Sequence, residues 1–216
     1  MHTIMLIHRV QKLLSKRASR LVFTREGFSH EKLSLISKKI VSTSLGKAYT
    51  ETPYTYVLPY AHTYVRSALW SYKYKNNKAL AKVFASLLSD NFQRTLVNIE
   101  DPLCIYVPSS PKSNTVRYYC SNALIIKQLS HIIHAEFTYD VLKKHTGVTK
   151  QSLTRTRTER LKNPRGAFSL IKKEIVFRRN IILFDDVITT GATVKEVSRL
   201  LTKAGARSVK VIALCH

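Results

Sequence analysis

The sequence has few cysteines, no long apolar run and few acidic residues. Its three cysteines, Cys104, Cys120 and Cys215, are odd in number and form no Cys-x-x-Cys pair. Because a structural zinc site needs four ligands at finger-like spacing, we expect no zinc, and we expect reduced thiols in a cytoplasmic protein. Cys104 and Cys215 fall in apolar runs and are predicted to pack as small hydrophobic residues.

Long apolar runs are absent as well. No stretch approaches the roughly 18 apolar residues that cross a bilayer, so we expect a soluble protein with no membrane span. A hydrophobic content of 44% favours a globular fold, and 216 residues suffice for one α/β domain with a small appendage.

Acidic residues are scarce beside basic ones. Thirteen Asp and Glu against 36 Lys and Arg give a formal net charge of +23. Such a charge favours polyanionic ligands, including single-stranded DNA or another nucleic acid, bound through the basic surface. The excess is spread along the chain, however, and a lysine-rich proteome would produce it too. A nucleic-acid partner and a merely solvated surface therefore both stay open.

The first 25 residues contain six bases and no acid, with apolar residues at partial helical spacing. This pattern is typical of a mitochondrial transit peptide or a membrane-surface helix. The alternative that we favour is a basic helix packed on the domain, or translation from an upstream start codon. A further amphipathic helix is predicted over residues 27–50, and two prolines between Thr50 and Pro59 indicate a linker or extended arm.

From residue 60 onward the pattern alternates between helices and strands. We expect helices over residues 64–72, 79–88, 114–134 and 194–204, and strands over residues 103–107, 137–142, 168–170, 181–184 and 208–214. This order predicts an α/β fold with a parallel sheet flanked by helices, whose ligands bind at the carboxyl ends of the strands. We therefore divide the chain into a helical basic N-terminal extension, residues 1–58, and one domain, residues 59–216.

The most informative stretch combines a strand, two acids, a hydroxyl-rich loop and a helix. Ile181 to Phe184 predict a buried strand, and Asp185 and Asp186 follow where that strand is expected to end. The loop from Thr189 to Thr193 contains Gly191 and leads into the helix. A helix N-terminus binds phosphate through its unpaired amides, whereas carboxylates accept hydrogen bonds from sugar hydroxyls or hold hydrated Mg²⁺. The stretch predicts a ribose-5-phosphate site rather than an ordinary helix cap, which needs only one such residue.

This stretch resembles the phosphoribosyl-pyrophosphate (PRPP) motif of type I phosphoribosyltransferases. The resemblance implies that Asp185 and Asp186 hold the ribose 2′- and 3′-hydroxyls. It also implies that the 5′-phosphate is wrapped by a loop made of Thr189, Thr190, Gly191, Ala192 and Thr193. Mg²⁺ is then expected near the two acids, held through PRPP and water with no direct protein ligand.

A wider resemblance covers about residues 60–216. The Tyr-Lys-Tyr at residues 72–74, the Val-Pro…Pro loop at 107–111 and the segment from Gln151 to Phe168 resemble the competence-protein-F (ComF) family of phosphoribosyltransferases. The fold that this implies is the type I phosphoribosyltransferase fold. The chain departs from the family in lacking a four-cysteine zinc module, and in having Arg-Tyr-Tyr-Cys at 117–120 where the family usually shows Arg-Gly-Phe-Asn.

The resemblance also assigns roles to two basic or hydroxylated segments. The loop after the strand at 103–107 is expected to contact pyrophosphate through Ser109, Ser110, Lys112 and Ser113. The segment from Lys143 to Gly166, with eight bases and one acid, is expected to close over the site between about residues 146 and 162. It supplies three candidates for stabilising the leaving group, Arg155, Arg157 and Arg160.

Asp185, Asp186, Lys112 and Arg157 are thus the predicted catalytic residues, with solvated surface charge as the alternative for each base. Purine-salvage relatives have an aspartate at the position of Thr189, and threonine cannot accept a proton near neutral pH. Hypoxanthine–guanine salvage is therefore disfavoured.

Three functions remain at this point. The first is transfer of 5-phosphoribosyl from PRPP to an unidentified base or amine, with release of pyrophosphate. The second is a non-catalytic PRPP or nucleotide sensor, or an accessory factor in DNA uptake. The third is a nucleic-acid-binding protein on the same scaffold. The pattern leaves open whether the chain forms a homodimer.

Overall fold

The computed structural model describes most of the chain from residue 49 onward. The described residues are 49–51, 54–74, 79–96, 99–109, 120–145 and 166–216. Four parts of the chain with sequence predictions lie largely or wholly outside them: the N-terminal extension, residues 110–113 of the pyrophosphate loop, residues 114–119 of the helix predicted over 114–134, and residues 146–165 of the basic segment.

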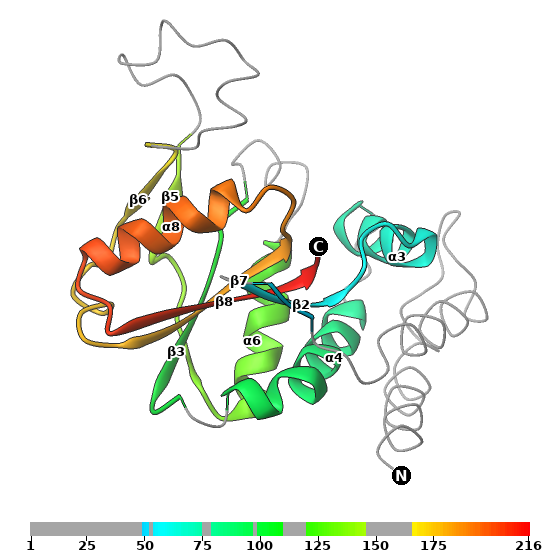
Figure 1. The fold of residues 1–216 in the computed structure, drawn as a ribbon, viewed down its shortest axis with the longest axis horizontal. Coiled ribbons are helices and arrows are strands. Elements are labelled where there is room, and N and C mark those ends of the chain that lie inside the picture. The colour runs from blue at the N-terminus through cyan, green and yellow to red at the C-terminus, as the bar shows by residue number, and fades with distance from the viewer. Residues whose placement is uncertain (1–48, 52–53, 75–78, 97–98, 110–119, 146–165) are drawn as a thin grey trace, which may run out of the picture.

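A mostly parallel sheet forms the centre of the molecule (Figure 1). Its strand order within the described residues is β1-β2-β8-β7-β3-β4, with only β1 antiparallel to its neighbour. The strands are β1 (Tyr49–Glu51), β2 (Tyr54–Leu58), β3 (Pro102–Tyr106), β4 (Glu136–Phe137), β7 (Asn180–Val187) and β8 (Ser208–Cys215). The predicted α/β fold with a parallel sheet is confirmed.

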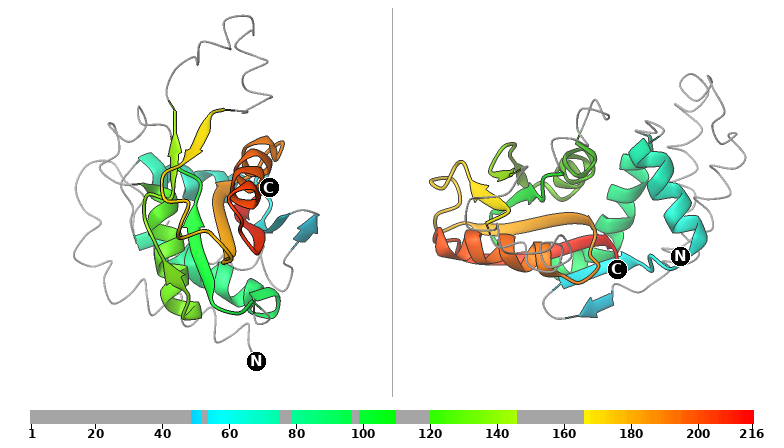
Figure 2. Two further views of the ribbon diagram at one scale, coloured as in Figure 1. Left: turned by 90° about the vertical axis from the view of Figure 1, so that its left-hand side faces the viewer. Right: turned by 90° about the horizontal axis from the view of Figure 1, so that it is seen from above.

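Helices cover both faces of this sheet. They are α3 (Thr63–Tyr74), α4 (Ala79–Leu96), α6 (Ser121–Ile133) and α8 (Ala192–Lys203). As Figure 2 shows, α4 and α6 lie on one face and α8 on the other. Each face has its own core. Ile182 and Phe184 of β7 pack with α4 and α6, while Ile181 and Leu183 pack with α8.

Burial on both faces explains the uninterrupted apolar run of β7. All four residues from Ile181 to Phe184 have no exposed surface, and β7 pairs with β3 on one side and β8 on the other. A strand in this position has no polar face to alternate with, so its sequence reads as continuously apolar. Cys104 and Cys215 are fully buried free thiols, and burial raises the pKa of Cys104 to about 12. Their predicted role as core residues is confirmed.

A separate two-stranded ladder joins the ends of the basic segment. Here β5 (Leu142–Lys144) pairs antiparallel with β6 (Phe168–Leu170), and the His145 amide donates to the Ala167 carbonyl over 2.9 Å. Residues 137–142 are therefore not one strand, as predicted, but the end of β4 and the start of β5. Asp140, in the left-handed region with φ 57°, turns the chain between them.

The interpretation of residues 50–59 as a linker or arm is wrong. Residues Tyr54–Leu58 form β2, which pairs in parallel with β8 from Val211 to Cys215. Val57 and Leu58 have no exposed surface. Pro59 directly follows the strand, where a missing amide breaks no hydrogen bond of the ladder. The sheet thus begins before the boundary drawn at residue 58.

No helix in the described part of the chain is long and apolar enough to cross a membrane.

Candidate active site

Two adjacent carboxylates lie near the carboxyl end of β7. The strand continues to Val187, so Asp185 and Asp186 lie within it rather than after it, and Asp185 pairs in register with Ala213 of β8. The prediction that the strand ends before the acids is therefore wrong. The cause is the length of β8, which offers pairing partners as far as Cys215 and so keeps both acids on the ladder.

Asp185 is held by two donors. Its Oδ1 accepts a hydrogen bond from Asn122 Nδ2 over 3.0 Å and another from the Asp186 amide over 2.9 Å. Burial, and secondly the negative charge of Asp186, raise the pKa of Asp185 to about 7, although the Asn122 hydrogen bond and Lys73 both favour ionisation. This carboxyl therefore changes protonation state close to neutral pH.

Asp186 forms an ion pair with a lysine from a distant helix. Lys73 Nζ, at the end of α3, lies 2.5 Å from Asp186 Oδ2. The two side chains are only 20% and 11% exposed, so water screens this pair less than it screens a surface salt bridge. Lys73 thereby partly neutralises the acid pair. Lys73 was not among the predicted site residues, although it is the central residue of the Tyr-Lys-Tyr that supported the family resemblance.

Asn122 connects the acid pair to the loop after β3. Its side-chain amide donates both to Asp185 and to the Val107 carbonyl, the latter over 3.0 Å. The side chain lies in the first turn of α6 and is 5% exposed, and its Oδ1 has no hydrogen-bond partner among the described residues. Asn122 was also missed, because an asparagine near a helix start is an ordinary feature of helix N-termini.

The hydroxyl-rich loop follows β7 directly and ends at the start of α8. Ile188 anchors it, since its amide donates to the Cys215 carbonyl over 2.9 Å. Gly191 is the N-cap of α8 with φ 72°, a left-handed conformation that favours glycine. It has no side chain to cap the helix, but the Ala192 amide donates to Thr190 Oγ1 over 3.4 Å. Thr189 and Thr190 are exposed. The first-turn amides of α8 thus meet the requirement for an anion site, with threonine hydroxyls beside them.

The remaining predicted site residues are only partly described. Ser109 lies three residues after the end of β3 and is half-buried. Ser110, Lys112 and Ser113 lie outside the described residues, as do Arg155, Arg157 and Arg160. The structure therefore brings together the two acids and the loop from Thr189 to Thr193, and adds Lys73 and Asn122 to them. Among the described residues, no three His, Cys, Asp or Glu side chains are grouped as metal ligands.

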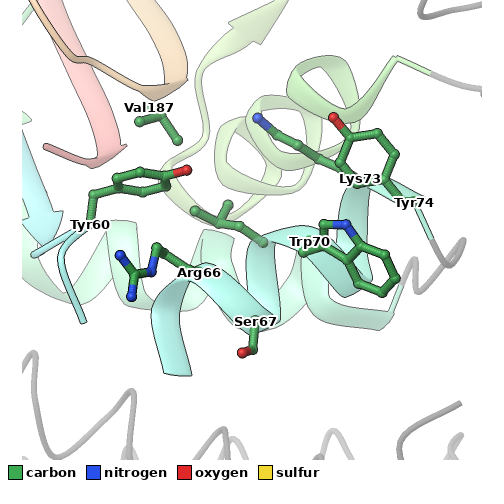
Figure 3. A pocket seen from close by; sticks show the side chains of 8 residues that line it. Tyr60, Arg66, Ser67, Trp70, Lys73, Tyr74 and Val187 are labelled. Atoms are coloured by element: carbon green, nitrogen blue, oxygen red, sulfur yellow. The ribbon is translucent and has the colours of Figure 1, made fainter. Parts of the chain in front are cut away.

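A pocket of about 380 Å³ adjoins the acid pair (Figure 3). Lys73 belongs to both sites, because it lines the pocket and binds Asp186. Most of the wall comes from α3, which lies beyond the carboxyl ends of β7 and β8 in Figure 1. The lining residues are Tyr60, Arg66, Ser67, Leu69, Trp70, Lys73, Tyr74 and Val187.

Known proteins resemble this chain in both sequence and fold. The family model described as "Phosphoribosyl transferase domain" matches residues 123–216. Competence protein ComFC of Streptococcus pneumoniae is 32% identical over 145 residues, 66% of this chain and 59% of the relative. Competence protein F of Haemophilus influenzae is 38% identical over 46% of this chain and 44% of the relative. The chain thus matches about half of the length of these relatives.

Among solved structures, the allosteric regulatory enzyme of purine biosynthesis is 19% identical to this chain, with a TM-score of 0.42. The match covers 67% of this chain and 29% of the enzyme's chain.

The parallel sheet and the matched domain define the chain as an α/β protein with the type I phosphoribosyltransferase fold. Within that superfamily the chain is similar to members of the ComF family, as the named relatives indicate.

Proposed function

We propose that this protein binds PRPP at the carboxyl end of β7 and transfers its 5-phosphoribosyl group to a small-molecule acceptor. The observation that carries the proposal is the succession of Asp185, Asp186 and the start of α8 after Gly191. Carboxylates accept hydrogen bonds from ribose hydroxyls, and the amides at the start of α8 suit the 5′-phosphate. A ribose 5-phosphate has its 2′- and 3′-hydroxyls at one end and its phosphate at the other, which is the order of the acids and the α8 amides along the chain.

The reaction breaks the bond between ribose C1 and a pyrophosphate oxygen, and the electron pair leaves with pyrophosphate. The acceptor's lone pair forms the new bond to C1. Asp185 and Asp186 hold the ribose while positive charge develops on the ring, and their own negative charge stabilises that state. Lys73 limits the mutual repulsion of the two carboxylates, so that both stay in place.

Bound Mg²⁺ would sit on PRPP oxygens and water near Asp185 and Asp186, where it would neutralise charge on the departing pyrophosphate. Two carboxylates with no third His, Cys, Asp or Glu beside them in the described part of the chain suit an ion of this kind, because Mg²⁺ retains most of its water when the protein offers few ligands. The bases Lys112 and Arg157 are proposed to assist the same departure, with Ser109, Ser110 and Ser113 contacting pyrophosphate.

The test is an acceptor screen with PRPP and Mg²⁺, read as release of pyrophosphate. Wild-type protein should release pyrophosphate with at least one base or amine, and the Asp185→Asn variant should release far less. If no acceptor in a broad panel gives release above the rate of PRPP hydrolysis, the transferase proposal fails.

A second candidate is a non-catalytic role in DNA uptake, with PRPP as a regulatory ligand. It is favoured by the names of relatives, which include competence proteins and a DNA utilization protein from Escherichia coli, and by the net charge of +23. This candidate requires PRPP to change the affinity for single-stranded DNA at near-physiological salt. DNA binding that is equal with and without PRPP would leave no role for the ribose site in it.

A further inference from the structure

The pocket beside the acid pair is built from exposed aromatic rings. Tyr60, Trp70 and Tyr74 are 40%, 49% and 55% exposed, and all three line the same hollow. Large aromatic side chains usually bury most of their surface, so three such rings around one pocket indicate a surface kept for a ligand. Figure 3 shows Tyr60 and Arg66 on one side, with Trp70 and Tyr74 on the other. A planar ligand ring between these two sides has aromatic side chains on both of them.

The polar part of the lining is positive. None of the eight lining residues is acidic, and two of them, Arg66 and Lys73, are basic. Lys73 is already paired with Asp186. Arg66 is exposed and has no acidic partner among the described residues. Its guanidinium, unpaired with any acid of the described residues, offers positive charge to whatever enters the pocket, and a planar fork that suits a carboxylate.

The pocket is adjacent to the place where ribose would be bound. Lys73 provides the connection: its stem lines the pocket beside Tyr74, and its ammonium lies 2.5 Å from Asp186 Oδ2. In Figure 3 this side chain extends away from the Trp70 and Tyr74 rings. Val187, the last residue of β7, also belongs to the lining and directly follows the acid pair. A residue that lines the pocket, Val187, is thus the immediate neighbour of Asp186 in β7.

We propose that this pocket is the acceptor subsite, and that the acceptor is a planar heteroaromatic ring carrying an anionic group such as a carboxylate. The inference rests on the proposed function, in which Asp185 and Asp186 hold the ribose. The ring stacks on Trp70 or Tyr60, and the anionic group faces Arg66. Arg66 and Trp70 are therefore specificity residues. They determine which acceptor binds rather than how the bond to pyrophosphate breaks.

A ring nitrogen with a free lone pair completes the chemistry without a protein base. The lone pair forms the bond to ribose C1 while the C1–oxygen bond breaks and its electron pair leaves with pyrophosphate. No proton has to be removed if the nitrogen carries none. This matters because the eight described lining residues include no carboxylate or histidine that could accept one, and Thr189 cannot do so.

Intrinsic fluorescence provides a direct binding test, since Trp70 is the only tryptophan of the chain. The probes are nicotinate and nicotinamide, which share one planar ring with a free ring nitrogen and differ in a carboxylate against a neutral amide. Both are titrated against the full-length protein in the presence of PRPP and Mg²⁺. Nicotinate should quench Trp70 at about tenfold lower concentration than nicotinamide, as a charge-assisted contact at a partly exposed site would give.

The variant Arg66→Met keeps a long side chain and removes the charge, so it should abolish that preference. Arg207→Met is the matched control, because Arg207 is also exposed but precedes β8 at the opposite end of the sheet. It should leave the preference unchanged. Equal binding of the two probes, no quenching by either, or an equal effect of the two substitutions would each overturn the subsite.

Calorimetric titration with PRPP keeps this test separate from the proposed function. If PRPP binds but neither ring does, the subsite is wrong and the ribose site stands. If the rings bind as expected and PRPP does not, the transferase proposal fails while the pocket keeps its preference for anionic rings.

Discussion

Asp185 is a carboxyl whose ionisation is opposed by its surroundings. Burial disfavours the charged form, the neighbouring Asp186 repels it, and together they raise the pKa of Asp185 to about 7. The folded state therefore keeps a proton that an unfolded chain releases near pH 4. Between about pH 4 and pH 7 the contribution of this group to folding stability falls as pH rises.

Binding of PRPP should reverse that balance. Ribose hydroxyls donate to a carboxylate and so favour its ionised form. Binding then releases a proton below pH 7, and PRPP affinity should fall by up to about tenfold per pH unit as pH decreases below 7. Calorimetry between pH 5.5 and 8 measures this dependence. Asp185→Asn is the control, because any dependence left in it belongs to PRPP itself. Identical pH profiles in wild type and variant would contradict the role of Asp185.

The individual acids should matter for affinity as well. Asp185→Asn and Asp186→Asn should each weaken PRPP binding by about ten- to a hundredfold, because each removes a charge-assisted hydrogen bond worth roughly 1.5–3 kcal/mol. Isothermal titration with PRPP and Mg²⁺ measures the loss, and circular dichroism checks that the fold is intact. Unchanged affinity in both variants would remove the ribose-site assignment.

Lys73 should contribute to stability through Asp186. Replacing it by methionine leaves two partly buried carboxylates without their cation, and we expect a loss of about 1–3 kcal/mol in the free energy of unfolding. In the Asp186→Asn background the same replacement should cost much less. Urea unfolding of the four proteins in this double-mutant cycle gives the coupling between the two side chains. A coupling near zero would mean that the ion pair contributes nothing.

At the scale of elements, the start of α8 depends on one glycine. Gly191 has φ 72°, and a Cβ there would lie 3.1 Å from Tyr54 Cε1 of β2. Gly191→Ala therefore combines a strained backbone, costing about 1–2 kcal/mol, with a tight contact. Its PRPP affinity should also fall, because the phosphate loop has to shift.

Gly166→Ala is a natural comparison for this substitution. Gly166 has φ 78°, but an added Cβ would meet nothing within 4 Å. It should show the backbone cost alone, so that the difference in unfolding free energy between the two variants measures the contact with Tyr54. If Gly191→Ala is the less destabilising of the two, the loop accommodates a side chain and its close packing against β2 is unimportant.

For the whole molecule, the net charge of +23 predicts DNA binding that depends on salt. Phosphate contacts release counterions, so affinity for single-stranded DNA should decrease steeply as salt rises, with no sequence preference. Fluorescence anisotropy with labelled oligonucleotides at several salt concentrations gives the slope. Binding that persists near physiological salt would support a functional nucleic-acid surface, whereas a flat dependence would contradict electrostatic binding altogether.

The sequence alone was sufficient for what depends on neighbouring residues. The apolar run of β7, the two acids, the glycine and the amphipathic α8 are contiguous, so local patterns were enough to predict the α/β fold, and the ribose-phosphate site stays a prediction from the same stretch. The exact ends of the strands could not be predicted as well from the sequence. The extent of β7 depends on where β8 offers hydrogen-bond partners, and that is not encoded beside Asp185.

Only the tertiary structure decided which distant residues complete the site. Asn122 reaches Asp185 across 63 positions, and Lys73 comes from a helix that precedes four of the sheet's strands. β2 likewise becomes a strand because β8 pairs with it, not because its own five residues require it. Side chains far apart in the chain meet only when the sheet and its helices pack. A basic residue on α3 therefore became a partner of Asp186 through folding, and its neighbours became the wall of a pocket.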